Sequence, residues 1–334
     1  MKSFWNNLPQ PFFALAPMEA VTDVVFRHVV QRAGAPDVFF TEFANATGWV
    51  HAGDKAIAGR LLKTGDEHPL VAQIWGGEPG DMEQFAAHCA RLGFDGIDIN
   101  MGCPAKSAIK SGGAALIRRP DVAVAAIHAA KTAGLPVSVK TRLGYTYVEE
   151  WREWLRTLLE QDIVNLTIHL RTKKEMSKAP AHYELIGDIV MLRDTVAPHT
   201  LLMINGDIRD RGHGLALAGA HPGVNGIMIG RGVFANPFCF AAGDTGYLHS
   251  QNNLEQNKAI SIDDDSVTAR YTELFDLLNY HLDLFDRYQP QTGRPFETLK
   301  RFFKIYIKGF DGAKELRDQL MHAASTDEVR RIIM

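Results

Sequence analysis

The chain has 334 residues, of which 46% are hydrophobic and 22% charged, so its composition is that of a globular protein with a sizeable core rather than that of a disordered or fibrous one. Its net charge of −3 requires any nucleic-acid partner to be bound by a local basic surface rather than by the field of the whole molecule. The three cysteines form no CxxC pair, which predicts neither a disulfide framework nor a metal site. With no secretory leader and no apolar run of membrane-spanning length, we expect a soluble, cytoplasmic protein.

The first 235 residues repeat one pattern, in which a short apolar run is followed by an amphipathic stretch of helical length. The predicted strands are Phe13–Pro17, Val38–Glu42, Leu70–Trp75, Gly96–Asn100, Val137–Arg142, Val164–Leu170, Leu201–Asn205 and Gly226–Gly230. Their nearly continuous apolar runs are typical of parallel strands that are covered on both faces. Predicted helices between them include Val122–Ala133, Val148–Leu159, His182–Leu192 and His213–Ala218. Eight such units favour an α/β fold of the (β/α)8 TIM barrel type over a doubly wound sheet.

The composition changes after the barrel pattern ends. We expect residues 1–243 to form the barrel, residues 244–265 to form a polar linker, and residues 266–334 to form a small α-helical bundle. In the last segment Lys300, Lys304 and Lys308 are spaced by four residues, which predicts one basic helical face. A solvated face is the plainer interpretation of that spacing, and an RNA-binding face is the functional one.

Polar residues follow the predicted strands at their carboxyl ends, where the active sites of such barrels lie. In chain order these groups are Pro17-Met18-Glu19, Thr41-Glu42, Gln73, Asn100 with Cys103, Lys140 with Arg142, His169 with Arg171, Asn205-Gly206-Asp207, and Gly230-Arg231-Gly232. The last two groups contain glycine and follow the seventh and eighth strands, where many barrels bind a phosphate through backbone N–H groups. We therefore predict a ligand that carries a phosphate.

These segments resemble the signatures of the tRNA-dihydrouridine synthase family, in order and over nearly the whole chain. The matching segments are Ala16–Asp23, Val71–Ile74, Asp98–Pro104, Gly112–Leu116, Val139–Gly144, Ile168–Thr172, Asn205–Ile208 and Met228–Gly232. Asp98-Ile99-Asn100-Met101-Gly102-Cys103-Pro104 is the most specific of them. The chain departs from the family at Ala20, where Gly is most frequent, and at Tyr183, where many members have Trp.

The resemblance implies an FMN-bearing barrel joined to a helical domain that holds tRNA. It implies reduction of tRNA uridine to 5,6-dihydrouridine, with hydride transfer from the flavin N5 to uracil C6, a proton from Cys103 to C5, and NADPH as the reductant of the flavin. The residues implied to bind the cofactor are Pro17, Met18, Gln73, Lys140, His169, Asn205, Gly206, Asp207, Gly230 and Arg231. Those implied to bind the RNA are Asn100, Arg171, Lys300, Arg301 and Lys304.

Three other functions remain open at this stage. One is an FMN-dependent reductase of a free pyrimidine or enone, and another is a lyase or aldolase that forms a Schiff base on Lys140. The third is an RNA-binding protein without significant catalysis. Single residues have plainer interpretations too: Cys103 as a small packed residue, His169 as a core histidine, and Lys140 or Arg171 as ion-pair residues. We infer neither a membrane partner nor an obligate protein partner.

Overall fold

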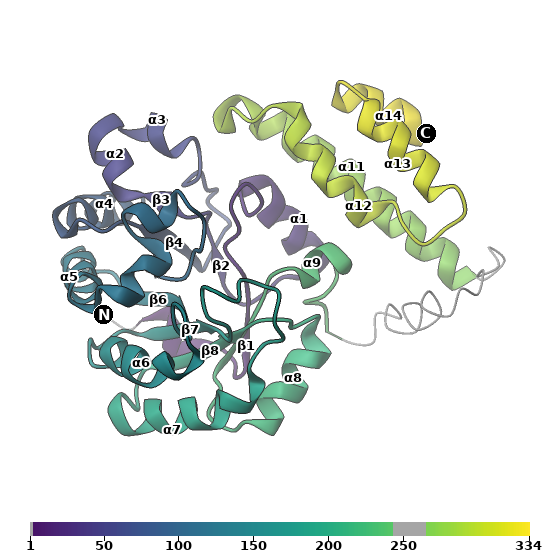
Figure 1. Cartoon of the computed structure of the whole chain (residues 1–334). Helices are drawn as coiled ribbons and strands as arrows, with labels where there is room; N and C mark the ends of the chain where they lie inside the picture. The colour runs from purple at the N-terminus through teal and green to yellow at the C-terminus, as the bar shows by residue number, and fades with distance from the viewer. Residues whose placement is uncertain (1–2, 243–264) are drawn as a thin grey trace. The chain divides into compact units, whose positions relative to one another are not determined.

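The structure is a computed structural model that describes residues 3–242 and 265–334 (Figure 1). These residues form two compact units. The first contains the described residues up to Asp23 together with Pro36–Gly230, and the second contains Val24–Ala35 together with the described residues from Arg231 onward. The predicted linker at 244–265 lies, apart from Asp265, outside the described residues. The predicted boundary at residue 243 stays a prediction.

The first unit is built on a parallel sheet that curves into a nearly closed barrel (Figure 1). The strands are β1 (Phe12–Leu15), β2 (Phe39–Phe40), β3 (Ala44–Asn45), β4 (Leu70–Trp75), β5 (Gly96–Asn100), β6 (Val137–Arg142), β7 (Asn165–His169), β8 (Leu201–Asn205) and β9 (Gly226–Ile229). Their hydrogen-bonded order is β1-β9-β8-β7-β6-β5-β4-β2, with β3 paired to β4. A parallel bridge between Ala14 and Val38 brings β1 to the chain just before β2. The predicted TIM barrel is confirmed.

Helices alternate with these strands and cover the outside of the barrel (Figure 1). They are α2 (Ala46–Ala52), α3 (Asp54–Ile57), α4 (Pro79–Arg91), α5 (Pro120–Lys131), α6 (Trp151–Leu159), α7 (Ile186–Val196) and α8 (Arg211–Ala220), with short 3-10 turns η1 (Phe4–Asn7), η2 (Ala108–Lys110), η3 (Gly113–Arg118), η4 (Val148–Glu150) and η5 (Tyr183–Leu185). α4 shows why they form: Pro79 opens the helix, and Met82, Phe85 and Cys89 bury one face. Sequence patterns did not predict β3, α2 or α3.

The barrel interior changes from apolar to polar along the strands. Near the amino ends, Phe12, Val71 and Met203 belong to one buried cluster with Trp5. Alternate residues of a strand share a face, so Gln73 follows Val71 on the inner face. In register with the next strands, Gln73 lies beside Asp98, and Asn100 lies beside Lys140. The polar side chains are therefore gathered toward the carboxyl ends of the strands.

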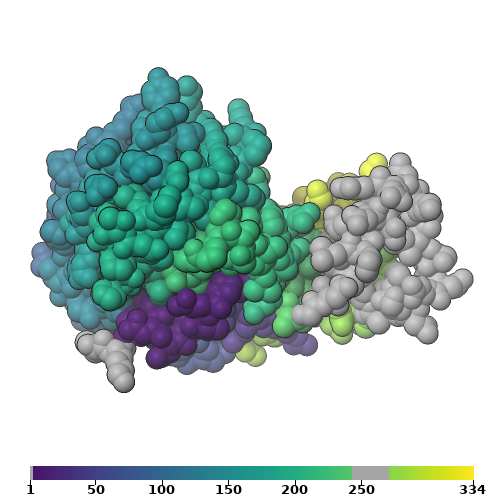
Figure 2. Space-filling model, turned by 90° about the horizontal axis from the view of Figure 1, so that it is seen from below, coloured from purple at the N-terminus to yellow at the C-terminus, as the bar shows by residue number. Residues whose placement is uncertain are grey.

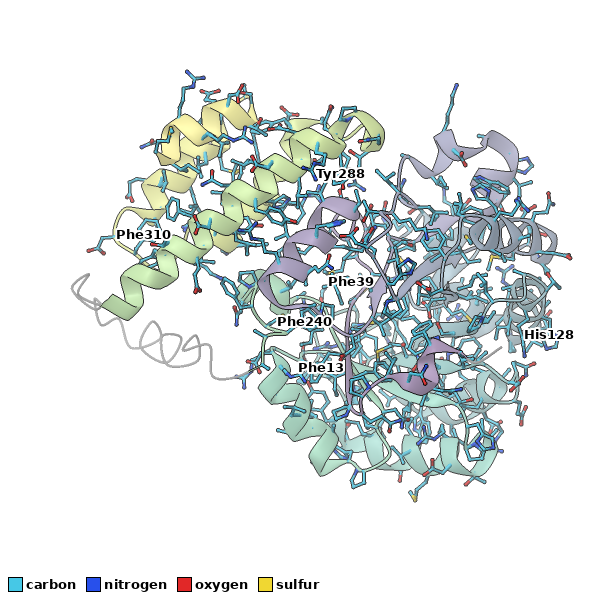
Figure 3. All side chains as sticks on the ribbon, turned by 180° about the vertical axis from the view of Figure 1, so that it is seen from behind. Phe13, Phe39, His128, Phe240, Tyr288 and Phe310 are labelled. Carbon is cyan, nitrogen blue, oxygen red and sulfur yellow. The ribbon has the colours of Figure 1, made fainter. Side chains whose placement is uncertain are left out.

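Polar side chains border β1, both on its outer face and where it pairs with the last strand, β9. Phe13, labelled in Figure 3, packs under the Arg211 guanidinium of α8, 4.5 Å from its ring centre. At the seam, Asn225 donates from Nδ2 to Gln10 Oε1 at 3.1 Å. In Figure 2 the purple surface of the N-terminal residues accordingly adjoins teal and green surface from later in the barrel.

The second unit is entirely helical in its described part, as the sequence predicted for residues 266–334. Its elements are α1 (Val24–Gly34), α9 (Gly232–Ala235), α11 (Asp265–Thr292), η6 (Phe296–Phe302), α12 (Phe303–Tyr306), α13 (Ala313–His322) and α14 (Thr326–Ile333). Phe302 packs against Phe26 of α1 and Phe234 of α9, with ring centres 4.9 and 6.2 Å apart. Tyr288, labelled in Figure 3, stacks on His28 of α1. Helix α1 therefore groups with elements that lie some 200 residues later in the chain.

The prediction that Lys300, Lys304 and Lys308 share one helical face is wrong. Lys300 lies in the 3-10 turn η6, Lys304 lies in α12, and the helix ends at Tyr306 before Lys308 is reached. The 3-10 geometry changes the angular step per residue, so an interval of four no longer keeps side chains on one face. Lys308 instead donates from Nζ to the carbonyls of Phe234, at 3.4 Å, and Ala235.

None of the helices in residues 3–242 and 265–334 combines the length and the apolar character needed to cross a bilayer.

Candidate active site

Buried side chains on the neighbouring strands β4, β5 and β6 form a chain of hydrogen bonds. Gln73 donates from Nε2 to Asp98 Oδ2 at 2.7 Å and accepts at Oε1 from Asn100 Nδ2 at 2.9 Å. Asp98 also accepts from the Ser138 hydroxyl at 2.6 Å. Gln73, Asp98 and Ser138 are fully buried. Since a buried polar group is costly when unpaired, these bonds fix the mutual orientation of the four side chains.

Two titratable groups of opposite charge lie in this interior. Burial raises the pKa of the Asp98 carboxyl to about 6, although the bonds from Ser138 and Gln73 and the charge of Lys140 act in the opposite direction. Burial lowers the pKa of the Lys140 ammonium to about 8, and the charge of Arg142 acts in the same direction. At neutral pH Asp98 is therefore mostly ionised and Lys140 mostly protonated.

Cys103 lies three residues beyond the end of β5 and is partly exposed. Its backbone N–H donates to Asn100 Oδ1 at 2.9 Å, and the N–H of Gly102 donates to the same oxygen at 3.1 Å. The Cys103 carbonyl accepts from the N–H of Ala114 at 3.0 Å. Burial raises the pKa of the Cys103 thiol, so this group keeps its proton at neutral pH. A protonated and partly accessible thiol is suited to donate a proton rather than to attack as a thiolate.

Arg142, the last residue of β6, fastens the Cys103 loop to the loop after β7. Its Nε donates to the carbonyl of Gly102 at 2.7 Å, and its Nη1 donates to the carbonyls of Thr172 and Met176 at 3.1 and 2.9 Å. Burial lowers its pKa to about 10, which still leaves it charged at neutral pH. Sequence analysis placed Arg142 at a strand end without giving it a role. The signal was its position two residues after Lys140, which puts both side chains on one face of β6.

A second polar group joins the ends of β7 and β8. Arg171 donates from Nη1 to His169 Nε2 at 3.2 Å, from Nε to the carbonyl of Ala179 at 2.5 Å, and from Nη2 to the carboxylate of Asp207. Because a guanidinium only donates, His169 Nε2 is the acceptor of this bond. The Asp207 carboxylate also accepts from the N–H of Ala181 at 3.2 Å. The Arg171 side chain is only 2% exposed, so this group is rigidly held.

The turn after β8 is held close to the same group. Gly206 has a φ of +127°, which favours glycine, and a Cβ there would lie 3.1 Å from the Cβ of Ala181. The Tyr183 hydroxyl donates to the carbonyl of Gly206 at 2.6 Å. Asn205 donates from Nδ2 to the carbonyl of Met228 at 2.9 Å and accepts at Oδ1 from Lys140 Nζ at 3.4 Å. Lys140 therefore connects this turn with the Cys103 side of the barrel.

The end of β1 lies beside the end of β9. The Met18 N–H donates to Thr22 Oγ1 at 3.0 Å, which fixes the turn that follows the buried Pro17. A Cβ on Gly230 would lie 3.4 Å from the Cβ of Ala16 and 4.0 Å from the sulfur of Met18. The two chain segments thus approach closely where the sequence predicts cofactor contacts. Arg231 begins the second unit, where it immediately precedes helix α9.

Aromatic and basic side chains that sequence reasoning did not single out lie beside one another on the loops after β6 and β7 and at the end of η3. The Tyr145 ring lies between Arg118, 3.9 Å from its centre, and Lys173, 4.9 Å from its centre. Tyr147 is 65% exposed, and Lys174 lies 5.8 Å from its ring centre. The available signal was the Tyr-x-Tyr spacing followed by paired lysines. Such a surface suits a polyanion that carries flat rings.

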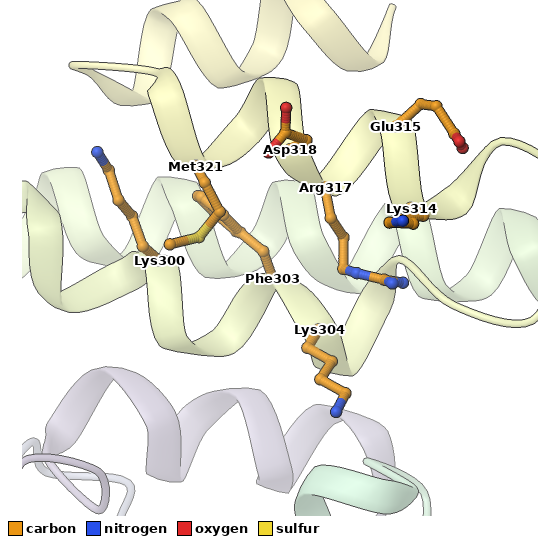
Figure 4. A pocket seen from close by; sticks show the side chains of 8 residues that line it. All are labelled: Lys300, Phe303, Lys304, Lys314, Glu315, Arg317, Asp318 and Met321. Carbon is orange, nitrogen blue, oxygen red and sulfur yellow. The ribbon is translucent and has the colours of Figure 1, made fainter.

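Within the second unit, basic side chains surround a pocket of about 560 Å³ between α12 and α13 (Figure 4). The lining residues are Lys300, Phe303, Lys304, Lys314, Glu315, Arg317, Asp318 and Met321. Two of the predicted RNA-binding residues, Lys300 and Lys304, thus share a pocket, whereas Arg301 is exposed on η6 and is not part of the lining. Sequence reasoning missed Lys314 and Arg317, which are three residues apart on α13 and so lie on one helical face.

Comparison with known proteins identifies the family of this chain. A family described as dihydrouridine synthase (Dus) matches residues 14–333. The chain belongs to the dihydrouridine synthase family. It is 55% identical to the "probable tRNA-dihydrouridine synthase 2" of Bacillus subtilis (strain 168), over 99% of this chain and 96% of that protein. It is 52% identical to the "probable tRNA-dihydrouridine synthase" of Staphylococcus aureus (strain Mu50), over 99% of this chain and 95% of that protein.

A solved structure with the same fold is that of 6-hydroxypseudooxynicotine amine oxidase from Pseudomonas geniculata N1, with a TM-score of 0.51 and 13% identity. The match covers 72% of this chain and 48% of that chain, and at this identity it shows the fold alone.

Ala20 is the position at which the sequence analysis expects glycine in most family members. The residue has a φ of +56°, in the left-handed region that glycine adopts at no steric cost. Its N–H donates to the Glu42 carboxylate. The backbone conformation thus gives a physical reason for the glycine that the family most often has here.

Proposed function

We propose that this protein reduces uridines in tRNA to 5,6-dihydrouridine in the cytoplasm, using bound FMN that is reduced by NADPH. Family membership and the names of its relatives support the reaction type and the RNA substrate. The observation that carries the mechanism is the Cys103 thiol, which burial keeps protonated just beyond the end of β5. A free pyrimidine would need no second unit with a pocket rich in basic side chains, and the pocket lined by Lys300 and Lys304 favours RNA over a small molecule.

The residues at the strand ends fit a flavin phosphate. Glycine at position 206 leaves room where a Cβ would crowd Ala181 and His169, and Lys140 supplies a cation among buried groups. When bound, FMN supplies the hydride that is added at C6 of uracil. In the proposal, Gln73, Lys140 and His169 hold the ring edge, Pro17 and Met18 pack beside it, and the ribityl phosphate is bound by the turn residues Asn205, Gly206, Asp207, Gly230 and Arg231.

The chain's own contribution to the chemistry is a proton and its placement. Cys103 Sγ holds the proton that passes to C5 of uracil, and a raised thiol pKa keeps that proton in place until the substrate arrives. Asn100 and Arg171 are proposed to contact the uracil or its neighbouring phosphate. Arg171 is well suited to this role because Asp207 and the Ala179 carbonyl hold its guanidinium in one orientation.

RNA binding is proposed to involve the surface formed by Lys300, Arg301 and Lys304. Phosphate contacts from lysine and arginine position an RNA without reading its sequence and weaken steeply as salt rises. The target base has to leave its stack to reach Cys103, so the folded shape of the tRNA contributes to selection.

The mechanism is tested with Cys103→Ala. We expect it to lower uridine reduction in a tRNA transcript by about 100-fold or more, the usual range for losing a general acid, while NADPH still reduces the bound flavin at the wild-type rate. Cys239→Ala, which removes a buried thiol of the second unit, is the matched control and should retain activity. Dihydrouridine is counted by mass spectrometry of the digested transcript. Wild-type dihydrouridine formation by Cys103→Ala would refute the role of the thiol, and a purified protein without flavin would refute the proposed reaction.

A further inference from the structure

The hydrogen bonds between Asp98 and Cys103 run in one direction through two side-chain amides. Gln73 Nε2 donates to Asp98, Asn100 Nδ2 donates to Gln73 Oε1, and the N–H groups of Gly102 and Cys103 donate to Asn100 Oδ1. Each amide thus turns its nitrogen toward Asp98 and its oxygen toward the Cys103 loop. This series of hydrogen bonds therefore runs in one direction from the Cys103 backbone to Asp98.

Both ends of this chain of hydrogen bonds explain that direction: the backbone N–H groups of Gly102 and Cys103 only donate, and the Asp98 carboxylate at the other end only accepts. An ionised carboxylate accepts hydrogen bonds and donates none, so Gln73 has to present Nε2 to it. Gln73 Oε1 then faces Asn100, which has to present Nδ2, and this leaves Asn100 Oδ1 facing the backbone of Cys103. Reversing either amide would set oxygen against oxygen in a buried site.

We propose that Asp98 is a positioning residue for the thiol: its carboxylate orients the Gln73 and Asn100 amides so that Asn100 Oδ1 anchors the Cys103 backbone. The inference deepens the proposed function, because the thiol is the proton donor in that proposal. Asp98 itself is 0% exposed, and its carboxylate oxygens are bonded to Ser138 and Gln73, so it acts through its neighbours rather than on a substrate.

Because Asp98 can be protonated, the constraint on the direction of these hydrogen bonds depends on pH. Burial raises the pKa of this carboxyl to about 6. Among the described residues that surround it, Lys140 on β6 is the charged group acting on Asp98, while Ser138 on β6 and Gln73 on β4 are neutral. A protonated Asp98 can donate to Gln73 Oε1, so below pH 6 the hydrogen bonds lose the constraint that the carboxylate supplies, and the Asn100 amide is held less firmly.

Hydrogen exchange of the Gly102 and Cys103 amides tests the inference without any flavin or RNA. In Asp98→Asn the residue at 98 can donate or accept, so the constraint from this end is lost and only the two backbone N–H groups still favour the original direction. We expect these two amides to exchange on the order of five- to tenfold faster than in the wild type, after correction for intrinsic rates. Ser138→Ala is the matched control, because it removes one bond to Asp98 but leaves the carboxylate facing Gln73, and it should change exchange by less.

A paired substitution separates orientation from mere packing. In Asp98→Asn with Asn100→Asp, the new carboxylate at 100 accepts both from Cys103 N–H and from Gln73 Nε2, and the new amide at 98 donates to Gln73 Oε1. Every bond can then be remade with Gln73 reversed, so slow exchange at Gly102 and Cys103 should return. Fast exchange that persists in the double variant would overturn the orienting role, as would wild-type exchange in Asp98→Asn.

If Asp98→Asn does not fold, the inference is tested on the wild-type protein by measuring amide exchange as a function of pH. Amide protection at Gly102 and Cys103 should fall as pH is lowered through about 6, and protection that stays constant from roughly pH 7 to 5 would overturn the inference. These measurements stand apart from the proposed reaction. If exchange behaves as expected while Cys103→Ala still forms dihydrouridine, the positioning inference holds and the proposed role of the thiol fails.

Discussion

Lys140 gives the sharpest prediction about pH. Burial lowers the pKa of its ammonium from 10.5 to about 8, and this shift corresponds to a cost of about 3 kcal/mol for holding the charge in the barrel interior. The folded-state pKa is depressed, so the cation is present below pH 8 and is lost as pH rises through 8. About nine-tenths of the molecules carry the charge at pH 7, and about one-tenth carry it at pH 9.

If FMN is bound through this ammonium, its affinity falls about tenfold for each pH unit above 8. The affinity is measured by adding apoprotein to FMN at a series of fixed pH values between roughly 7 and 9.5 and following the flavin fluorescence. An anion bound beside Lys140 also raises the pKa of the ammonium again, so binding near pH 8.5 should take up protons, which calorimetry in two buffers detects.

Lys140→Arg is the matched control, because a guanidinium stays charged over the whole range. Its FMN affinity, whatever its absolute value, should be nearly independent of pH, and that of Lys140→Met should be both weak and independent of pH. An affinity of the wild-type protein that does not change between pH 7 and 9.5 would refute the assignment of Lys140 to the cofactor.

Two further predictions concern the second unit. Replacing Lys300, Arg301 and Lys304 together by Ala should weaken tRNA binding at least about tenfold and flatten its dependence on salt, as measured by filter binding, while NADPH oxidation by the flavin continues. A control with the same change in charge replaces three exposed bases of the first unit, Lys55, Arg91 and Arg152, and an equal loss there would contradict a local RNA surface. In the core, the Tyr306 hydroxyl lies 2.7 Å from Nδ1 of His281, whose pKa burial lowers to about 3, so the ring is neutral. Tyr306→Phe should destabilise the protein by about 1–3 kcal/mol in urea unfolding, because it leaves a buried nitrogen unpaired, and adding His281→Phe should recover part of this loss.

The sequence specified the barrel strands in detail where both faces of a strand are buried. Leu70–Trp75, Gly96–Asn100, Val137–Arg142 and Leu201–Asn205 are strands with the predicted bounds. Continuous apolar runs between turn residues leave little choice of conformation. β3 and α2 escaped prediction, because Gly48 and Gly53 interrupt the apolar pattern of a segment whose structure depends on its pairing with β4.

The basic segment shows the opposite case. Spacing alone predicted one helical face for Lys300, Lys304 and Lys308, but the chain adopts a 3-10 turn and a single α-helical turn. Phe302, at the end of the 3-10 turn, packs against Phe26 and Phe234. These partners are distant in sequence, so local spacing could not predict the contact. Lys308 is consequently used to hold backbone carbonyls near α9.

By itself, the sequence determined the kind of fold and the set of polar residues that end its strands, because a parallel barrel brings all carboxyl ends to one side whatever the side chains are. Only the tertiary structure decided which of these residues touch. Arg142 grips the carbonyls of Gly102, Thr172 and Met176, and Asp98 orients two amides between itself and Cys103. Every residue has a backbone carbonyl, so the sequence cannot show which carbonyls Arg142 binds. The orientation of an amide depends on its partners from neighbouring strands, so local sequence cannot predict it either.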